Sequence, residues 1–384
     1  MELRYDSVET SVTRIKVIGI GGGGNNTIDR MVEAGLQGAE FIAMNTDMQQ
    51  LNRSKAPTKL QLGARATSGR GCGARPERGR KSAEENKEEI AKLLENTDLV
   101  FITAGMGGGT GTGGAPVVAE IAKSMGILTV GVVTRPFKFE GAQRAKQAEA
   151  GLAEFHQYVD ALVVIPNERL KYVTDQKITF LNAFAYADDV LKQAISSIYE
   201  LITMQGLISL DFADVQTIMQ DSGYAHMGVG RAAGKDKAME AAQMAIQSPL
   251  LETSIRGAKG VLINIVGSPD LELDEVDTAA SIVRENADPE ADIIFGAAID
   301  PTLNDEMRIT IIATGFEDDS PNMLDSEPKA APKAAPKAAP ADDLDLPFQQ
   351  RPQPQEPAQP KAQPRSDSYS KEYDTLLQML RGQQ

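Results

Sequence analysis

The sequence predicts an α/β protein in which a parallel sheet, covered by helices on both faces, is followed by a long central helix, a smaller α/β domain and a disordered C-terminal tail. Three observations lead to this fold class. Strand-like apolar runs alternate with helical patterns through the first half of the chain, which is the order that builds a parallel sheet. A second, mixed set of strands and helices follows, and the composition changes abruptly after residue 316. With 384 residues, 41% of them apolar, the chain is long enough for two globular units and an extension.

The first set of elements lies in a domain that we expect to cover residues 13–179, after a flexible N-terminus, 1–12. Each strand-like run is short and continuously apolar, as expected for a strand buried on both faces. The expected strands cover residues 15–20, 41–44, 99–103, 128–133 and 162–165, and the expected helices between them include 83–94 and 115–124.

A long apolar helical pattern follows, and we expect this central helix, 180–205, to join two domains. The second domain, 206–316, has mixed element order and short connections, which favours a separate α/β unit. Its expected helices cover 235–247 and 274–285, and its expected strands cover 261–266, 293–299 and 309–313.

The C-terminal tail has a composition that cannot form a core. Residues 317–384 hold 11 of the 20 prolines, one of the 34 glycines and no Val or Ile. We expect 317–366 to be a disordered Pro/Ala-rich linker, and 367–384 to be a partner-binding peptide. An apolar stripe at helical spacing supports the prediction that this peptide binds a partner as a helix. The alternative is a frayed chain end with no partner. The stripe consists of Tyr369, Tyr373, Leu376, Leu377 and Leu380.

Charge and residue usage exclude several functions. The chain has 39 basic and 54 acidic side chains, a net charge of −15, which argues against a general nucleic-acid or anionic-membrane binder. Cys72 is the single cysteine, and His156 and His226 lie far apart, so we expect no zinc site. The N-terminus has acids where a signal peptide would be basic, and no apolar run approaches ~20 residues. We therefore expect a cytoplasmic protein with no direct membrane insertion.

Two glycine-rich loops each follow a buried strand and precede a helix. The first, 19–24, satisfies G-x-G-x-x-G, and Asp47 ends the next strand where a dinucleotide fold keeps its ribose carboxylate. An NAD-dependent oxidoreductase is therefore one alternative. The second loop, 105–114, favours a different ligand, because two such loops at the carboxyl ends of parallel strands converge on one phosphate chain. Neither loop contains the Gly-Lys-Ser/Thr of a P-loop, so we expect backbone N–H groups, a nearby Arg and Mg2+ to neutralise the phosphates.

Five motifs together resemble the tubulin/FtsZ family. They are GIGGGGNN at 19–26, NTD at 45–47, GMGGGTGTGGAP at 105–116, VTRPFKFEG at 133–141 and DFADV at 211–215. The resemblance extends from about residue 15 to 316. It implies a Rossmann-like GTP-binding domain, a central helix and a smaller activation domain, with GTP or GDP as ligand. It also implies a cytoskeletal GTPase of the bacterial division ring, located at mid-cell, which forms head-to-tail filaments and hydrolyses GTP with help from the next subunit.

The resemblance also assigns the site residues. Gly22, Gly23, Gly24, Asn25 and Asn26 match the first phosphate loop, and Gly107, Gly108, Gly109, Thr110 and Gly111 match the second. Glu140 and Arg144 match the pair at the ribose and phosphates, Asn167 the base-side loop, and Phe184 and Asp188 the guanine contacts. Guanine presents two adjacent donors that one carboxylate accepts together, so Asp188 would select GTP over ATP. Without the resemblance, an exposed acidic turn of helix would be the simpler interpretation of Asp188.

Asp211 and Asp214 have two interpretations. Their spacing before an apolar helical run is typical of an N-cap with a capping-box acid. The resemblance instead matches them to the acidic loop that one subunit inserts against its neighbour's γ-phosphate, where they would orient water or Mg2+.

Three segments depart from the family pattern. Ser209 stands where Asn is usual, which would weaken the contact across the junction, so a filament protein with very weak hydrolysis is a second alternative. Residues 63–80 carry five arginines that would form a solvated lid, hold phosphate or bind nucleic acid, and Cys72 would be a small residue within this lid. The family's C-terminal peptide is only faintly echoed at 345–348, so the division-ring proteins and membrane anchors that bind the tail stay unidentified.

Overall fold

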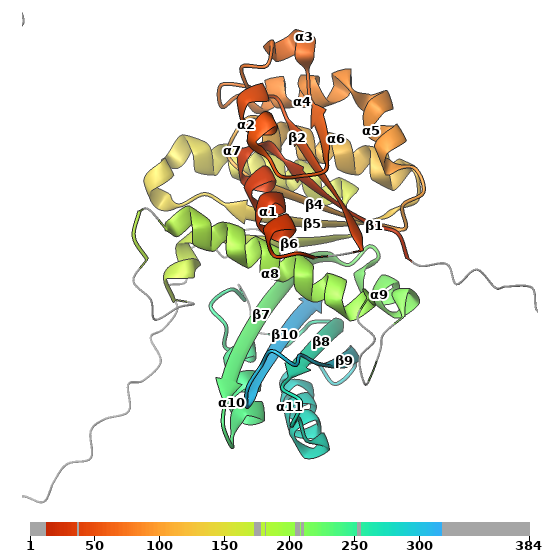
Figure 1. Cartoon of the computed structure of the whole chain (residues 1–384), viewed down its shortest axis with the longest axis vertical. Helices are drawn as coiled ribbons and strands as arrows, with labels where there is room; N and C mark the ends of the chain where they lie inside the picture. The colour runs from red at the N-terminus through yellow and green to blue at the C-terminus, as the bar shows by residue number, and fades with distance from the viewer. Residues whose placement is uncertain are drawn as a thin grey trace, which may run out of the picture. The chain divides into compact units, whose positions relative to one another are not determined.

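The computed structural model describes residues 13–36, 38–172, 178–180, 182–203, 208, 211–251 and 255–316. The predictions for the N-terminus, for Ser209 and for the linker and C-terminal peptide therefore concern residues outside the described ranges. Six parallel strands form the first part of the sheet, in the order β3-β2-β1-β4-β5-β6 (Figure 1). They are β1 (Ile15–Ile20), β2 (Ala39–Asn45), β3 (Thr58–Gln61), β4 (Leu99–Gly105), β5 (Leu128–Arg135) and β6 (Ala161–Pro166).

Helices cover both faces of these strands, as a doubly wound sheet requires. Alternate residues of β1 enter different cores: Val17 packs in a core with helix α1, and Ile18 packs in a core with helices α5 and α6. In chain order the helices are α1 (Gly21–Glu33), α2 (Met48–Arg53), α3 (Ala64–Thr67), α4 (Pro76–Glu85), α5 (Lys87–Leu94), α6 (Thr110–Ser124) and α7 (Ala142–Phe155), with 3-10 turns η1 (Lys138–Glu140), η2 (His156–Tyr158) and η3 (Asn167–Tyr172).

A 21-residue helix, α8 (Ala183–Thr203), packs beside α1 and its apolar side chains belong to the same core. The remaining elements continue the sheet, because β7 pairs with β6 in parallel over three residues. The order from there is β7-β10-β8-β9, with antiparallel pairs on both sides of β10 and a parallel pair β8–β9. These elements are α9 (Phe212–Met219), β7 (Gly223–Ala233), α10 (Lys237–Ile246), β8 (Gly260–Gly267), α11 (Leu273–Asn286), β9 (Asp292–Ile299) and β10 (Glu306–Thr314).

Two sequence predictions about helices need correction. The helix expected at 83–94 is interrupted at Asn86, where α4 ends and α5 begins. The Asn86 amide oxygen accepts from the Gly63 N–H at 2.8 Å, and its nitrogen donates to Glu89, so the side chain competes with the helical pattern. The helix expected from about Ala115 begins at Thr110, so Gly111, Gly113 and Gly114 are helical rather than part of the loop.

None of the helices in the described ranges combines the length and the apolarity needed to cross a bilayer.

Candidate functional site

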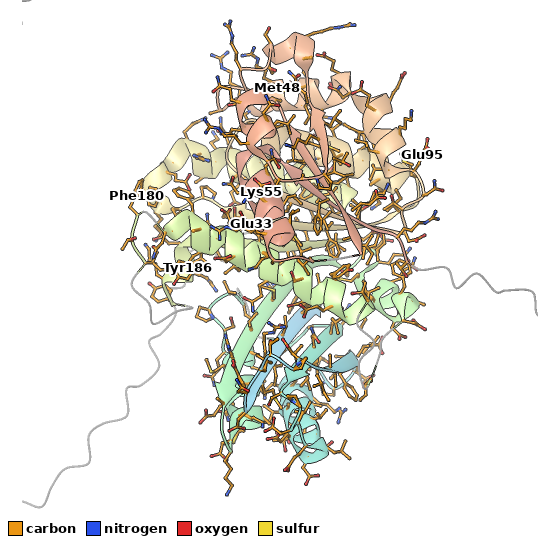
Figure 2. All side chains as sticks on the ribbon, in the orientation of Figure 1. Glu33, Met48, Lys55, Glu95, Phe180 and Tyr186 are labelled. Carbon is orange, nitrogen blue, oxygen red and sulfur yellow. The ribbon has the colours of Figure 1, made fainter. Side chains whose placement is uncertain are left out.

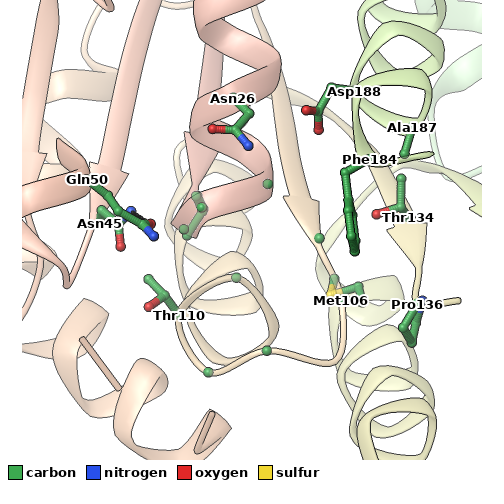
Figure 3. A pocket seen from close by; sticks show the side chains of 18 of the residues that line it. Asn26, Asn45, Gln50, Met106, Thr110, Thr134, Pro136, Phe184, Ala187 and Asp188 are labelled. Carbon is green, nitrogen blue, oxygen red and sulfur yellow. Dashed lines mark hydrogen bonds between the residues drawn. The ribbon is translucent and has the colours of Figure 1, made fainter. Parts of the chain in front are cut away.

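A pocket of about 340 Å3 opens at the carboxyl ends of β1, β2, β4 and β5, which is where open parallel sheets bind ligands (Figure 3). Residues from the end of each of these strands line it: Ile20, Asn45, Gly105 and Thr134. The walls also include twelve residues that the sequence assigned to nucleotide binding. These are Gly22, Gly23, Asn26, Gly108, Gly109, Thr110, Gly111, Glu140, Arg144, Asn167, Phe184 and Asp188.

Three predicted residues lie behind the pocket wall instead. A Cβ on Gly24 would overlap the Thr103 carbonyl oxygen, so this glycine allows α1 to pack against β4. The Asn25 side chain is buried, and in the amide orientation that satisfies its surroundings it donates to the Gly19 and Gly21 carbonyls at 2.8 and 3.1 Å. Gly107 has a φ of +93°, and a Cβ there would lie 2.7 Å from Cγ of Arg144. These residues shape the loops rather than line the cavity.

Two helix N-termini point at the pocket. α1 begins at Gly21 and α6 at Thr110, and neither helix has a side-chain cap. Their first N–H groups therefore have no partner from a capping side chain, and the helix dipoles add positive potential. The two loops touch, because a Cβ on Gly21 would lie 3.1 Å from the Gly111 nitrogen. This arrangement suits a chain of phosphates lying across both loops.

One wall of the pocket contains an ion pair between an acidic and a basic side chain. Arg144, on α7, pairs with Glu140 at 2.8 Å. The other oxygen of Glu140 accepts the Phe137 N–H at 2.8 Å, which closes the turn η1. Both side chains are thereby positioned at the rim before any ligand arrives.

Asp188 is a buried carboxylate on the second turn of α8, beside Asn26 of α1 in the pocket wall (Figure 3). Burial raises the pKa of Asp188 from its usual 3.8 to about 7, and the neighbouring Asp189 carboxylate adds to the rise. The Arg30 guanidinium, 3.6 Å away, and the Asn26 amide oppose this rise but do not cancel it. At neutral pH this carboxyl group therefore changes protonation easily.

Aromatic rings cluster around Phe184, one turn before Asp188. Phe184 meets Phe137 edge to face, with ring centroids 5.5 Å apart, and Phe139 stacks on Phe137 at 5.1 Å. Phe180, which is 73% exposed, lies at the outside of the molecule (Figure 2). The Phe184 ring forms part of the pocket wall, so a flat ligand can stack on it.

Asn167 begins η3, directly after β6, and is 4% exposed. Its Oδ1 has no hydrogen-bond partner within the described part of the chain. A buried acceptor without a partner is costly, so a donor from a ligand in the pocket would satisfy it.

Several lining residues were not singled out from the sequence. Gln50 follows the end of β2, and its Oε1 accepts from Nδ2 of Asn45 at 3.2 Å. Asp47 belongs to the NTD motif and was considered as the ribose ligand of the oxidoreductase alternative, but it was given no role in GTP binding. Its carboxylate caps α2 by accepting the N–H groups of Gln49 and Gln50 at 2.9 and 3.3 Å. The signal that would have found Asp47 is its position just after the carboxyl end of a parallel strand, and Gln50 follows in the first turn of the next helix.

The arginine-rich segment 63–80 reaches the pocket through Gly71. Cys72 is buried, and its Sγ donates to the Thr46 hydroxyl at 3.3 Å, beside the second glycine loop. No cluster of three or more His, Cys, Asp or Glu side chains suited to a metal occurs among the described residues.

Asp211 and Asp214 do not line this pocket. They form a reciprocal capping box at the start of α9, in which Asp214 N–H donates to Asp211 Oδ1 at 2.9 Å and Asp211 N–H donates to Asp214 Oδ2 at 3.2 Å. Phe184 and Asp188 lie in the first two turns of α8, whereas these two acids follow its far end. A helix of 21 residues is about 30 Å long, so the acids cannot reach the pocket of their own chain.

Comparison with known proteins agrees with this geometry. Residues 14–175 match the Tubulin/FtsZ family, GTPase domain, and residues 223–317 match the FtsZ family, C-terminal domain. A solved FtsZ dimer of M. jannaschii is 46% identical, with a TM-score of 0.77, over 80% of this chain and 89% of that one.

More distant structures share the fold alone. CetZ1 from Haloferax volcanii, solved as a GDP-bound monomer, is 20% identical, with a TM-score of 0.69, over 81% of this chain and 96% of that one. CetZ2 from the same organism, solved as a GTPγS-bound protofilament, is 20% identical, with a TM-score of 0.64, over 78% and 92%. The pocket at the strand ends and the two matching domains lead to one conclusion: this chain belongs to the FtsZ group of the tubulin/FtsZ family, and it is a GTPase.

Proposed function

We propose that this chain binds GTP in the pocket at the strand ends, assembles head to tail into filaments, and completes its active site only where two subunits meet. The phosphates lie on the uncapped N-termini of α1 and α6. Glu140 and Arg144 hold the ribose and the adjacent phosphate. Asn167, Phe184 and Asp188 hold the base.

The base contacts favour guanine. An ionised Asp188 accepts the N1–H and the 2-amino group of guanine together, whereas adenine offers no such pair of donors. Stacking on Phe184 adds apolar contact without selecting a base. Selection of GTP over ATP therefore rests on Asp188.

A magnesium ion fits the phosphate end of the pocket. Mg2+ is typically bound by one or two carboxylates together with phosphate oxygens, rather than by a full set of protein ligands. Asp47 is the carboxylate beside the two glycine loops, and the Gln50 and Thr110 side chains add neutral oxygens. When bound, the ion would neutralise phosphate charge and polarise the terminal phosphate.

The trans mechanism is supported by the carboxylates that line the pocket, because each has a structural partner and is already assigned above to Mg2+, the ribose or the base. Asp47 caps α2, Glu140 pairs with Arg144, and Asp188 faces Arg30. Hydrolysis needs a group that orients the attacking water. Asp211 and Asp214 have the right chemistry but lie beyond the far end of α8, so a neighbouring subunit must supply them. An interface between two different patches of identical subunits propagates into a filament, and the M. jannaschii relative was solved as a dimer.

Two inactive variants test this arrangement directly. Asp214→Ala subunits keep the GTP pocket, and Asp188→Ala subunits keep the catalytic acids. Each alone should hydrolyse little GTP, whereas a mixture should recover activity, because roughly one junction in four then pairs an intact pocket with intact acids. A mixture of Asp211→Ala with Asp214→Ala is the control and should stay inactive. Recovery in neither mixture, or a wild-type specific activity that stays constant on dilution, would rule out the trans site.

We further propose that the filaments act in the cytoplasm as the septating division ring at mid-cell, held by anchors that bind the C-terminal peptide. Membership in the FtsZ group supports this role. Fluorescent fusion of the chain should give a mid-cell band in dividing cells, and deletion of 367–384 should disperse the band without lowering GTPase activity. A uniform signal from the full-length fusion would contradict the role.

A further inference from the structure

The pocket holds little positive charge for the ligand proposed above. Its charged lining residues are three acids, Asp47, Glu140 and Asp188, and one base, Arg144. The Arg144 guanidinium is already paired with Glu140 at 2.8 Å. A nucleoside triphosphate carries several negative charges. A basic side chain near the terminal phosphate would therefore strengthen its binding, beyond what the backbone dipoles of the two glycine loops provide.

The arginine-rich segment lies directly beside this end of the pocket. Met48 N–H donates to the Gly69 carbonyl at 3.0 Å, and Gly71 N–H donates to the Thr46 carbonyl at 3.1 Å. These bonds pair 69–71 with the connection between β2 and α2, and Gly71 itself forms part of the pocket wall. The segment is therefore fixed beside the site by its backbone, while four of its five arginines are exposed and Arg80 is partly buried.

Arg70 is an arginine of this segment that lies beside the lining residues of the pocket. It forms an antiparallel bridge with Asp47, and bridged residues project their side chains from the same face. Asp47 lines the pocket, and so does Gly71, the residue after Arg70. The described residues give the Arg70 side chain no hydrogen bond or ion pair. Arg78, by contrast, donates to the Ala66 carbonyl at 2.8 Å, and Arg80 pairs with Glu84 at 3.1 Å.

We propose that Arg70 binds the terminal phosphate of GTP held in its own subunit, and so acts as a specificity-determining residue that distinguishes GTP from GDP. A guanidinium presents a fork of donors that matches two phosphate oxygens. GDP lacks the terminal phosphate and loses this contact. The inference rests on the proposed binding of GTP in the pocket, and it assigns a role to a side chain that the rest of that proposal does not use.

Equilibrium binding to dilute, unassembled protein tests this role. Fluorescent GTP and GDP are titrated into wild-type, Arg70→Ala and Arg65→Ala protein at concentrations too low for filaments. Arg65 is the matched control, because it is an exposed arginine of the same segment that is not bridged to a lining residue. We expect Arg70→Ala to weaken GTP binding about tenfold and to leave GDP binding within about twofold. Unchanged GDP binding also shows that the variant is folded.

Three results would overturn the inference, and they are distinguishable. Equal GTP affinity of Arg70→Ala and wild type would show that the side chain does not touch the nucleotide. If the variant then also failed to form filaments, the side chain would instead lie at the junction between subunits. If Arg65→Ala lost as much GTP affinity as Arg70→Ala, the effect would come from the overall positive charge of the segment rather than from a contact with the phosphate. Failure of wild-type protein to bind either nucleotide would remove the proposed function itself, and the inference with it.

Discussion

The carboxyl group of Asp188 links pH to both stability and nucleotide binding. Burial raises the pKa of Asp188 to about 7, above its usual 3.8, so the folded protein holds this proton more tightly than the unfolded chain does. Its contribution to the free energy of unfolding is therefore fully present below pH 3.8 and is lost as pH rises through 7. We expect Asp188→Asn to stabilise the nucleotide-free protein at pH 8 by roughly 2 kcal/mol, with a smaller gain at pH 5, where only part of the contribution is lost, as measured by chemical denaturation.

The affinity for guanine should rise with pH, whereas the contribution of Asp188 to stability falls with pH. The reason is that the two guanine donors need the ionised carboxylate. Binding should release a proton, so the apparent affinity for GTP is expected to fall about fivefold from pH 7 to pH 6 and to level off above pH 8. Asp188→Asn is the matched control, since the nucleotide titrates identically with both proteins. The same fall in the variant would assign the proton to another group.

At the scale of elements, glycines within the helices α4 and α6 allow close packing of the two helices. A Cβ on Gly113 would overlap the Pro76 carbonyl oxygen, and one on Gly79 would overlap that of Gly109, so α4 and α6 lie backbone to backbone. Replacing a helical glycine with alanine normally stabilises a helix by about 1 kcal/mol. Gly113→Ala should instead destabilise the protein by about 2 to 3 kcal/mol, because the helices must separate. Gly108→Ala, which meets nothing within 4 Å, should leave the melting temperature unchanged. A stable Gly113→Ala protein would contradict this packing.

The same packing explains what the sequence could and could not predict. Five of the six strands of the parallel sheet were predictable because each is a continuous apolar run, and β1 matches its expected range. β3 was not expected, because its sequence, TKLQ, has no apolar run. β7 was not expected, because Gly228 and Gly230 interrupt its pattern, and only the close approach of α10 shows why they are there. Within the site, a glycine repeat predicts a phosphate cradle but not which glycines face the ligand. Gly24 and Gly107 therefore cannot be told apart from Gly23 and Gly108 without the fold.

At the scale of the whole molecule, α8 holds the two ends of the proposed active site apart. At its first turns, Arg30 of α1 lies 3.6 Å from Asp188 and 3.1 Å from Asp189. Near its last turns, Glu200 pairs with Arg308 of β10 at 3.3 Å. A helix fixed at both ends does not bend enough to bring α9 to the pocket, which supports the proposal that a second molecule completes the site.

This arrangement separates the two interpretations of Asp211. Serine is as good an N-cap as aspartate, so Asp211→Ser should keep the capping of α9 and change the free energy of unfolding by less than about 0.5 kcal/mol. It removes the carboxylate, however, and we expect GTP hydrolysis to fall at least about a hundredfold while GTP binding by the monomer is unchanged. Filaments should still form and should persist longer after GTP addition, which sedimentation over time measures. If the aspartate only caps the helix, Asp211→Ser will hydrolyse GTP at the wild-type rate. If the Asp211 carboxylate is instead needed for folding, the variant will unfold at a lower denaturant concentration. It will then lose both stability and GTP hydrolysis.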